Sequence, residues 1–405
     1  MNVLMIAPGY PAEMPLFARG LARAGAQVYG LSDVPQPELP EVARRYLSGY
    51  LRVPSMLDEA GVVRAAQQWA RGKTIDRVVC LWEPGVLLAA RLRERLGVPG
   101  MGVEQSELYR DKDLMKQAVS AAGVRCPLHA AANTAAGVRE AAEVVGYPLI
   151  IKPIDGAGSM DTYRVADAAE LEAAIAKMGH VPAVNVEEFI EADEYTFDTI
   201  CIDGQIQYFN IGFYRPRPLV ARQEQWISPQ TLTLRDVDAP HLQGGVAMGR
   251  AVLDALEFRD GFTHMEWYRK ADGEVVFGEI AARPPGAHTV DLMNYGSDID
   301  LYAGFGEATV QRTFTQTVER KYNSVNIFKR AQGEGRIRRI EGLDRIRQSF
   351  GEHIVHVDLL PVGAQRRDWI QTLVSDGYVV LRHPDLARAQ EMADVVGRDL
   401  QLYAG

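Results

Sequence analysis

The chain has 405 residues, 47% of them hydrophobic, which is enough for a large core divided over two or three packed units. Its formal net charge is −9 with both signs interspersed, and this argues against the basic footprint of a nucleic-acid-binding protein. The three cysteines are far apart, which predicts a reducing cytoplasm, and no apolar run approaches the length of a membrane span. The opening stretch MNVLMIAPGY is predicted to be a buried strand rather than a signal peptide.

Residues 1 to about 105 alternate between strand and helix patterns. Such βαβ alternation predicts a parallel sheet covered by helices. The loop after the first strand lacks the glycine fingerprint of a dinucleotide site, so that cofactor is not expected. The predicted strands are 3–7, 27–31 and 77–81, and the predicted helices are 16–24, 57–70 and 86–96.

Two carboxylates follow strands of this first unit. Glu13 comes after the first strand, and Glu83 comes after the strand 77–81. Both lie where parallel strands end, which is the edge at which ligands of such sheets bind. An ordinary loop carboxylate is the alternative interpretation for each.

Two lysines stand in positions that favour an anion partner. Lys112 begins a helix predicted to start after Asp111, which is the unfavourable end of a helix for a positive charge. Lys152 follows the apolar strand 149–151, where a charge is costly unless it is paired. The loop that comes next carries Gly156 and Gly158, which allow backbone N–H groups to approach a phosphate.

An antiparallel meander is predicted after this loop, with strands at 184–189, 195–202 and 205–210. Glu187, Glu188 and Glu194 gather at its first bend. Residues 213–235 are then predicted to form a long surface loop that acts as a lid, with an ordinary solvated loop as the alternative. Arg215 and Arg222 of this loop are the candidates for contact with a substrate carboxylate.

The stretch from Gly261 to His288 is predicted to contain a hairpin that turns at Asp272 and Gly273. Glu266 and Glu279, thirteen residues apart, then lie on neighbouring strands. A cation between them would relieve their repulsion, and Mg²⁺ is the usual ion in a phosphate site. Arg283 follows and could stabilise a phosphoryl group or an oxyanion. A surface hairpin with two solvated glutamates is the alternative.

The remaining segments are predicted from shorter patterns. His264 and His288 flank the metal strands, and packing histidines are the expectation for both, although His288 and Glu83 are also candidates for substrate contact. A helix is predicted at 241–257. Strands at 323–328, 354–360 and 378–382 and a helix at 384–397 predict a small α+β unit at the end of the chain.

In order and approximate spacing, these residues resemble the ATP-grasp superfamily. The resemblance covers essentially the whole chain and is strongest to carboxylate–amine ligases, including the L-amino-acid ligases. It rests on the two lysines, the glycine loop, the run EEFI at residues 187–190, Glu194, Glu266 and the run EIAAR at 279–283. Many members carry Asn two residues after the second metal carboxylate, where this chain has Ala281.

The resemblance implies an α/β fold, with α+β parts, in three pieces. These are a Rossmann-like pre-ATP-grasp domain (1–105), an ATP-grasp domain that holds ATP and Mg²⁺ (106–315), and a C-terminal α+β subdomain (316–405). The C-terminal piece resembles that of biotin-carboxylase-like members.

The resemblance also implies roles for single residues. Lys112 and Lys152 would bind the α- and β-phosphates of ATP, and the backbone of Gly156, Gly158 and Ser159 would cover the β- and γ-phosphates. Adenine would be recognised by the Glu187 side chain and by backbone atoms of Glu188 and Ile190. Glu194 would take the ribose hydroxyls. Glu266 and Glu279 would bind Mg²⁺, with Mn²⁺ as an alternative, and Arg283 would act on the transferring phosphate.

The implied activity is an ATP-dependent, ADP-forming ligase that joins a small-molecule carboxylate to an amine through an acyl phosphate. Neither nucleic acid nor a membrane is an expected partner, and the resemblance admits a homodimer. Two alternatives stay open at this point: an enzyme that activates bicarbonate, and a nucleotide-binding regulator without catalysis.

Overall fold

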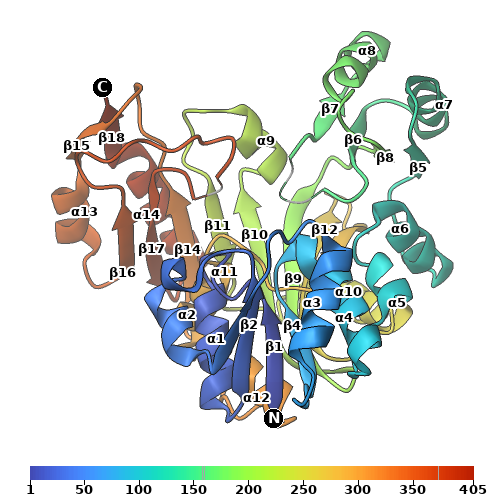
Figure 1. Ribbon diagram of the computed structural model, residues 1–405. Helices are drawn as coiled ribbons and strands as arrows, with labels where there is room; N and C mark the ends of the chain where they lie inside the picture. Colours follow the sequence, from blue (N-terminus) through green and yellow to red (C-terminus); the bar gives the residue numbers. More distant parts are fainter. Residues whose placement is uncertain (157, 159, 373) are drawn as a thin grey trace.

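The computed structural model describes residues 1–156, 158, 160–372 and 374–405 (Figure 1). Across these residues, no helix combines the length and the apolar character needed to cross a membrane. The strands of this described part of the chain fall into four sheets, of which the first three along the chain position the site.

The N-terminal sheet has four parallel strands in the order β3-β2-β1-β4, which confirms the prediction from βαβ alternation. Residues Val3 to Ile6 of its central strand are fully buried because helices cover both faces. The short β3 and α2 were not predicted. The strands are β1 (Asn2–Ile6), β2 (Gln27–Ser32), β3 (Gly49–Arg52) and β4 (Arg77–Cys80), and the helices are α1 (Met14–Arg23), α2 (Glu41–Tyr46), α3 (Glu59–Trp69) and α4 (Val86–Leu96).

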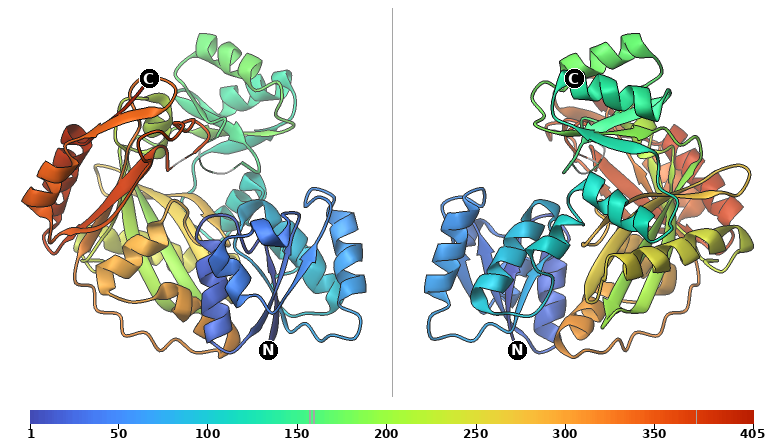
Figure 2. Two further views of the ribbon diagram at one scale, coloured as in Figure 1. Left: turned by 60° about the vertical axis from the view of Figure 1, so that its left-hand side comes forward. Right: turned by 90° about the vertical axis from the view of Figure 1, so that its right-hand side faces the viewer.

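A second, antiparallel sheet has the order β5-β8-β6-β7 and stands apart from the N-terminal sheet (Figure 2). Helices α7 and α8 cover it, and α5 and α6 lead into it from the N-terminal sheet. The strands are β5 (His129–Ala132), β6 (Leu149–Pro153), β7 (Tyr163–Val165) and β8 (Val184–Glu188), and the helices are α5 (Val103–Glu107), α6 (Lys112–Ala121), α7 (Ala135–Val145) and α8 (Ala168–Lys177).

The third sheet has eight antiparallel strands in the order β13-β12-β9-β10-β11-β14-β17-β16. The predicted hairpin and the predicted strands 195–202 and 205–210 are confirmed as neighbouring strands at one end of it. The predicted meander is wrong in its first strand, 184–189, because this segment is β8 and pairs with β5 and β6 of the small sheet. The predicted C-terminal strands extend the same sheet rather than forming one of their own. Its strands are β9 (Asp193–Ile202), β10 (Gln205–Arg215), β11 (Gln230–Thr233), β12 (Gly261–Arg269), β13 (Val275–Ala281), β14 (Asn323–Phe328), β16 (Ile354–Leu359) and β17 (Gly377–His383).

The helices of this half of the chain cover both faces of the large sheet. Phe262 of β12 packs with α1 and α12, whereas Met265 and Trp267 of the same strand belong to the core on the side of α10. Strands β15 and β18 form a separate two-stranded ribbon. The elements are α9 (Pro218–Gln223), α10 (Gln243–Ala255), α11 (Thr289–Ser297), α12 (Leu301–Val310), α13 (Leu343–Phe350), α14 (Leu386–Asp399), β15 (Ile337–Glu341) and β18 (Gln401–Ala404).

Close packing of α1 against α12 fastens the N-terminal sheet to the large sheet. A Cβ at Gly20 would lie 1.9 Å from the carbonyl oxygen of Tyr302, and one at Gly306 would lie 2.2 Å from that of Gly20. Only glycines allow the two helices to approach so closely. The ring of Phe17 fills the space beside them, with its centroid 4.8 Å from that of Tyr302.

The prediction of a long surface loop at 213–235 is wrong. Strand β10 continues to Arg215, α9 follows, and the four residues of β11 are all buried between β10 and β14. Residues of β11 form a strand because they hydrogen-bond to β14, which lies almost a hundred residues further along the chain. A partner so distant leaves no signal in the sequence around β11. Residues 224–229 keep the irregular structure that was expected.

Candidate functional site

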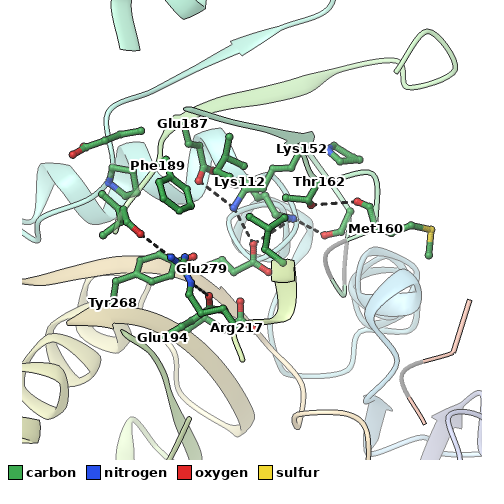
Figure 3. A pocket seen from close by; sticks show the side chains of 18 residues that line it. Lys112, Lys152, Met160, Thr162, Glu187, Phe189, Glu194, Arg217, Tyr268 and Glu279 are labelled. Carbon is green, nitrogen blue, oxygen red and sulfur yellow. Dashed lines mark hydrogen bonds and ion pairs between the residues drawn. The ribbon is translucent and has the colours of Figure 1, made fainter. Parts of the chain in front are cut away.

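A pocket opens between the small antiparallel sheet and the large sheet. One wall comes from α6, β6 and β8, and the other comes from β9, β12 and β13. Figure 3 shows polar side chains from both walls pointing toward one another. Of the residues singled out in the sequence, the structure brings these together at the pocket: Lys112, Lys152, Gly156, Glu187, Glu188, Ile190, Glu194, Glu266 and Glu279.

Lys152 is the cation at the centre of this arrangement. It extends from the apolar strand β6, and its Nζ lies 3.1 Å from Glu187 Oε2 and 3.4 Å from Glu279 Oε2. Burial alone would lower the pKa of Lys152, but the two carboxylates raise it above its usual value. The costly position of a lysine on an apolar strand is thus offset by two ion pairs.

Lys112 approaches the same carboxylate from the start of α6. Asp111 caps this helix by accepting from the backbone N–H groups of Asp113 and Leu114, which confirms the predicted N-cap. The Lys112 ammonium donates to the backbone carbonyl of Gly156 and lies 3.7 Å from Glu279 Oε2. Burial alone would raise the pKa of Glu279, but Lys112 and Lys152 hold it well below its ordinary value.

Lys116 was not singled out in the sequence. It follows Lys112 by one helical turn and is fully buried, with its Nζ 2.8 Å from Glu187 Oε1. Burial lowers the pKa of Lys116 despite the opposing effect of Glu187. The spacing of four residues from Lys112 was the available signal, because it puts both lysines on one face of a helix.

The two predicted metal carboxylates are direct partners across the β12–β13 hairpin. Glu266 and Glu279 are opposite each other in the register, and their side chains are 22% and 30% exposed at the pocket. Throughout the described residues, no group of three or more His, Cys, Asp or Glu could hold a metal ion. Two carboxylates with room for phosphate and water oxygens fit Mg²⁺, which retains several non-protein ligands.

His264 stands beside this pair on β12. Its Nδ1 lies 2.6 Å from Asp198 Oδ1, and its Nε2 lies 3.6 Å from Glu266 Oε1. Burial alone would lower the pKa of His264, but Asp198 and Glu266 raise it to about 9. The expectation of a packing histidine did not include this ion pair.

An arginine that was not chosen in the sequence enters the other end of the pocket. Arg217, just before α9, has its Nε 2.9 Å from Glu194 Oε2 and donates from Nη1 to the Ile190 carbonyl at 2.8 Å. Its guanidinium lies over the Tyr268 ring, 4.9 Å from the centroid. Burial and the nearby Glu266 raise the pKa of Glu194 to about 7 against the opposing effect of Arg217.

Arg283 leaves β13 toward the N-terminal sheet and binds Glu83. Its Nε donates to Glu83 Oε2, and Arg110 Nη1 donates to Glu83 Oε1 at 2.5 Å. Burial alone would raise the pKa of Glu83, but the two arginines lower it. Glu83 is therefore a bridge between two cations at the edge of the first sheet, and Arg110 is a partner that sequence analysis did not single out.

The remaining predicted residues do not line the pocket. Arg215 binds Gln230 and Asp394, whereas Arg222 donates to the carbonyls of Gly158 and Ile370. The backbone N–H of His288 donates to Glu13 Oε1 at 2.7 Å, and its ring stacks on Tyr378. Ser159 lies outside the described residues, and the carbonyl of Gly158 is held by Arg222 as stated.

Comparison with known proteins agrees with this geometry. The ATP-grasp domain family matches residues 109–212. The L-arginine-specific L-amino acid ligase of Bacillus subtilis is 25% identical over an alignment of 292 residues, and the match covers 70% of this chain and 69% of that protein. The alanine–anticapsin ligase of Bacillus subtilis (strain 168) is 26% identical over 255 residues, and the match covers 53% of each protein, about half its length.

The solved structures agree on the fold. The crystal structure of an L-amino acid ligase from Bacillus licheniformis superposes with a TM-score of 0.81 at 20% sequence identity. The superposition covers 100% of this chain and 99% of the other. The architecture is therefore shared along the whole length of the chain.

Proposed function

From the ATP-grasp fold of the chain we propose that it is an ATP-dependent ligase that joins a carboxylate to an amine and releases ADP and phosphate. The observation that carries the proposal is that one pocket holds two lysines paired with Glu279 and, beside them, Glu266, the register partner of Glu279. Cations for phosphate oxygens and carboxylates for a divalent ion are the two requirements of phosphoryl transfer.

Lys112 and Lys152 are the proposed ligands of the ATP phosphates. Both ammonium groups already face Glu279, and a phosphate bound at a metal beside Glu279 would lie within their reach. The Gly156 and Gly158 backbone, together with Ser159, is the proposed cover over the β- and γ-phosphates.

The proposed base and ribose contacts lie along β8 and the start of β9. Glu187, Glu188 and Ile190 would recognise adenine, and Glu194 would accept from the ribose hydroxyls. Arg217 belongs with this group, because it binds both Glu194 and the Ile190 carbonyl.

Glu266 and Glu279 are the proposed carboxylate ligands of the divalent ion. When bound, Mg²⁺ or Mn²⁺ would neutralise phosphate charge and orient the nucleotide. Arg283 is proposed as a further positive charge, in addition to the lysines and the metal ion, on the side of the N-terminal sheet. Burial alone would lower its pKa, but Glu83 raises it, so that Arg283 keeps its charge inside the protein.

The chemistry follows from the weakness of a carboxylate as an acylating group. The γ-phosphoryl group of ATP passes to a carboxylate oxygen and converts that oxygen into a good leaving group. The amine then attacks the carbonyl carbon, a C–N bond forms, and phosphate departs with the oxygen. The residues of this chain contribute placement and charge stabilisation, and the covered pocket keeps water away from the acyl phosphate.

Both substrates are proposed to be small molecules of the amino-acid class, since two relatives are named as ligases of amino acids. Cys80, Cys126 and Cys201 are free and buried, which supports the proposal of a reducing, cytoplasmic setting.

The decisive experiment is isotopic. Amino-acid pairs are first screened for phosphate release, and an active carboxylate substrate is then labelled with ¹⁸O. One label should appear in the released phosphate, with ADP as the nucleotide product. AMP with pyrophosphate, or unlabelled phosphate, would contradict the acyl phosphate. Phosphate release with ATP and bicarbonate alone would instead favour bicarbonate activation, and tight ATP binding without turnover on any pair would favour a regulator.

A further inference from the structure

A chain of polar side chains runs across two strands of the large sheet to Glu266. Asp198 of β9 and His264 of β12 are register partners, and Glu266 follows His264 on the same face. The His264 ring spans them, with Nδ1 2.6 Å from Asp198 Oδ1 and Nε2 3.6 Å from Glu266 Oε1. The ring thus stands between the two carboxylates, with one nitrogen directed toward each of them.

Asp198 is held in place on its other side. The residue is fully buried, and its Oδ2 accepts from Thr196 Oγ1 at 2.9 Å and from Asn210 Nδ2 at 3.1 Å. These two donors occupy Oδ2 and leave Oδ1 for the imidazole. A carboxylate fixed in this way fixes the plane of the ring that it binds.

The opposite strand provides the space for the ring. Ala281 of β13 is the register partner of His264, and its methyl group leaves room beside Glu266. The hydroxyl of Tyr214 donates to the same Oε1 of Glu266 at 3.3 Å. One oxygen of Glu266 thus accepts from Tyr214 and lies beside the His264 ring, while the carboxylate remains partly exposed to the pocket.

We propose that His264 is a positioning residue that orients Glu266 for the divalent ion, with Asp198 as the anchor of His264. The inference rests on the proposed metal site. In this interpretation the buried Asp198–His264 pair does more than fill the core, because it aligns the Glu266 carboxylate for the metal ion. Partners of this kind around metal sites typically change metal affinity by about 10- to 100-fold when they are removed.

The test measures metal binding directly. Two variants remove the imidazole. The first is His264→Ala. The second combines His264→Phe with Asp198→Asn, so that a ring of similar volume remains and no uncompensated charge is buried. Thr263→Val is the matched control, because Thr263 is the adjacent residue and loses a buried hydrogen bond to Thr199 of 2.6 Å on the opposite face. Free Mn²⁺ is followed by electron paramagnetic resonance with a non-hydrolysable ATP analogue, and metal-free affinity for the analogue is measured by calorimetry.

Both His264 variants should bind Mn²⁺ at least tenfold more weakly than the wild type, with unchanged metal-free affinity for the analogue. Mn²⁺ affinity within twofold of the wild type in the double variant would overturn the inference, as would an equal loss in Thr263→Val. Failure of the wild type to bind Mn²⁺ would overturn the proposed metal site as well. A wild type that binds Mn²⁺ but forms no C–N bond would contradict the proposed reaction alone.

Discussion

At the scale of single residues, Lys152 is the strongest test of the nucleotide site. Its ammonium pairs with both Glu187 and Glu279, and its side chain is 12% exposed at the pocket. Lys152→Met should weaken ATP affinity at least tenfold, about 1.4 kcal/mol, because a charge-assisted contact with phosphate is lost. Calorimetry with ATP and Mg²⁺ measures the effect.

The matched control is Lys177→Met, which removes an exposed lysine at the end of α8 in the same part of the chain. Its ATP affinity should equal that of the wild type. If Lys152→Met bound ATP as tightly as this control, Lys152 would not be a phosphate ligand.

The pKa of Glu194 predicts how the stability of the ligand-free protein depends on pH. Its pKa rises from the ordinary 4.5 to about 7, because burial and the nearby Glu266 favour the neutral acid. The folded state then binds a proton that the unfolded state releases. This contribution of Glu194 to the free energy of unfolding is fully present below about pH 4.5 and is lost as the pH rises through about 7.

Glu194→Gln removes this titration. Between pH 5 and pH 8, the free energy of unfolding of the wild type should therefore fall relative to that of the variant by an amount on the order of 1–3 kcal/mol. Urea unfolding without nucleotide or metal measures both curves. Parallel curves would show that Glu194 has an ordinary pKa.

The sequence could indicate only those site residues whose role is visible from their own neighbours in the chain. Lys152 and Glu279 were recognisable because each conflicts with its own surroundings: one is a charge on an apolar strand, and the other is a carboxylate opposite a second one. Arg217 was not preferred to Arg215, because the choice depends on how α9 turns against the small sheet. Glu83 could not be matched to Arg283, since two hundred residues separate them.

At the scale of elements, α9 is the least supported helix beside the pocket. It has six residues, which is too short to be stable without tertiary contacts. Arg330 holds its end by donating to the carbonyls of Ala221 and Glu224, and Trp226 beyond it is exposed. The predicted long loop at 213–235 is wrong, and we now predict a shorter mobile segment at 216–229.

Hydrogen exchange tests that segment. Without nucleotide, amides of residues 216–229 should exchange faster than those of β10 and β11, which are tied into the large sheet. Saturating ATP analogue with Mg²⁺ should slow them, because Arg217 contacts Glu194 in the pocket. Protection equal to that of β11 without a ligand would exclude a lid.

At the scale of the whole molecule, the pocket depends on pieces far apart in the sequence. Glu83, after the last strand of the first sheet, binds Arg283, the small sheet contributes Lys152, and the large sheet contributes both proposed metal carboxylates. The helices and the parallel sheet could be predicted from short stretches of the sequence. The joining of β14, β16 and β17 to the central strands could not, because strand order is set by contacts between distant segments.

That shared sheet makes the C-terminal strands part of the structural support of the site. Val325 of β14 is the register partner of Leu232 in β11, and both are fully buried in one core. Val325→Asp puts a charge into that core, which costs several kcal/mol, and it should lower the melting temperature and ATP affinity together. Val362→Asp, at a position that is 62% exposed, is the control and should change neither. If Val325→Asp melted residues 316–405 alone and left ATP affinity intact, the C-terminal strands would be an independent unit rather than a continuation of the central sheet.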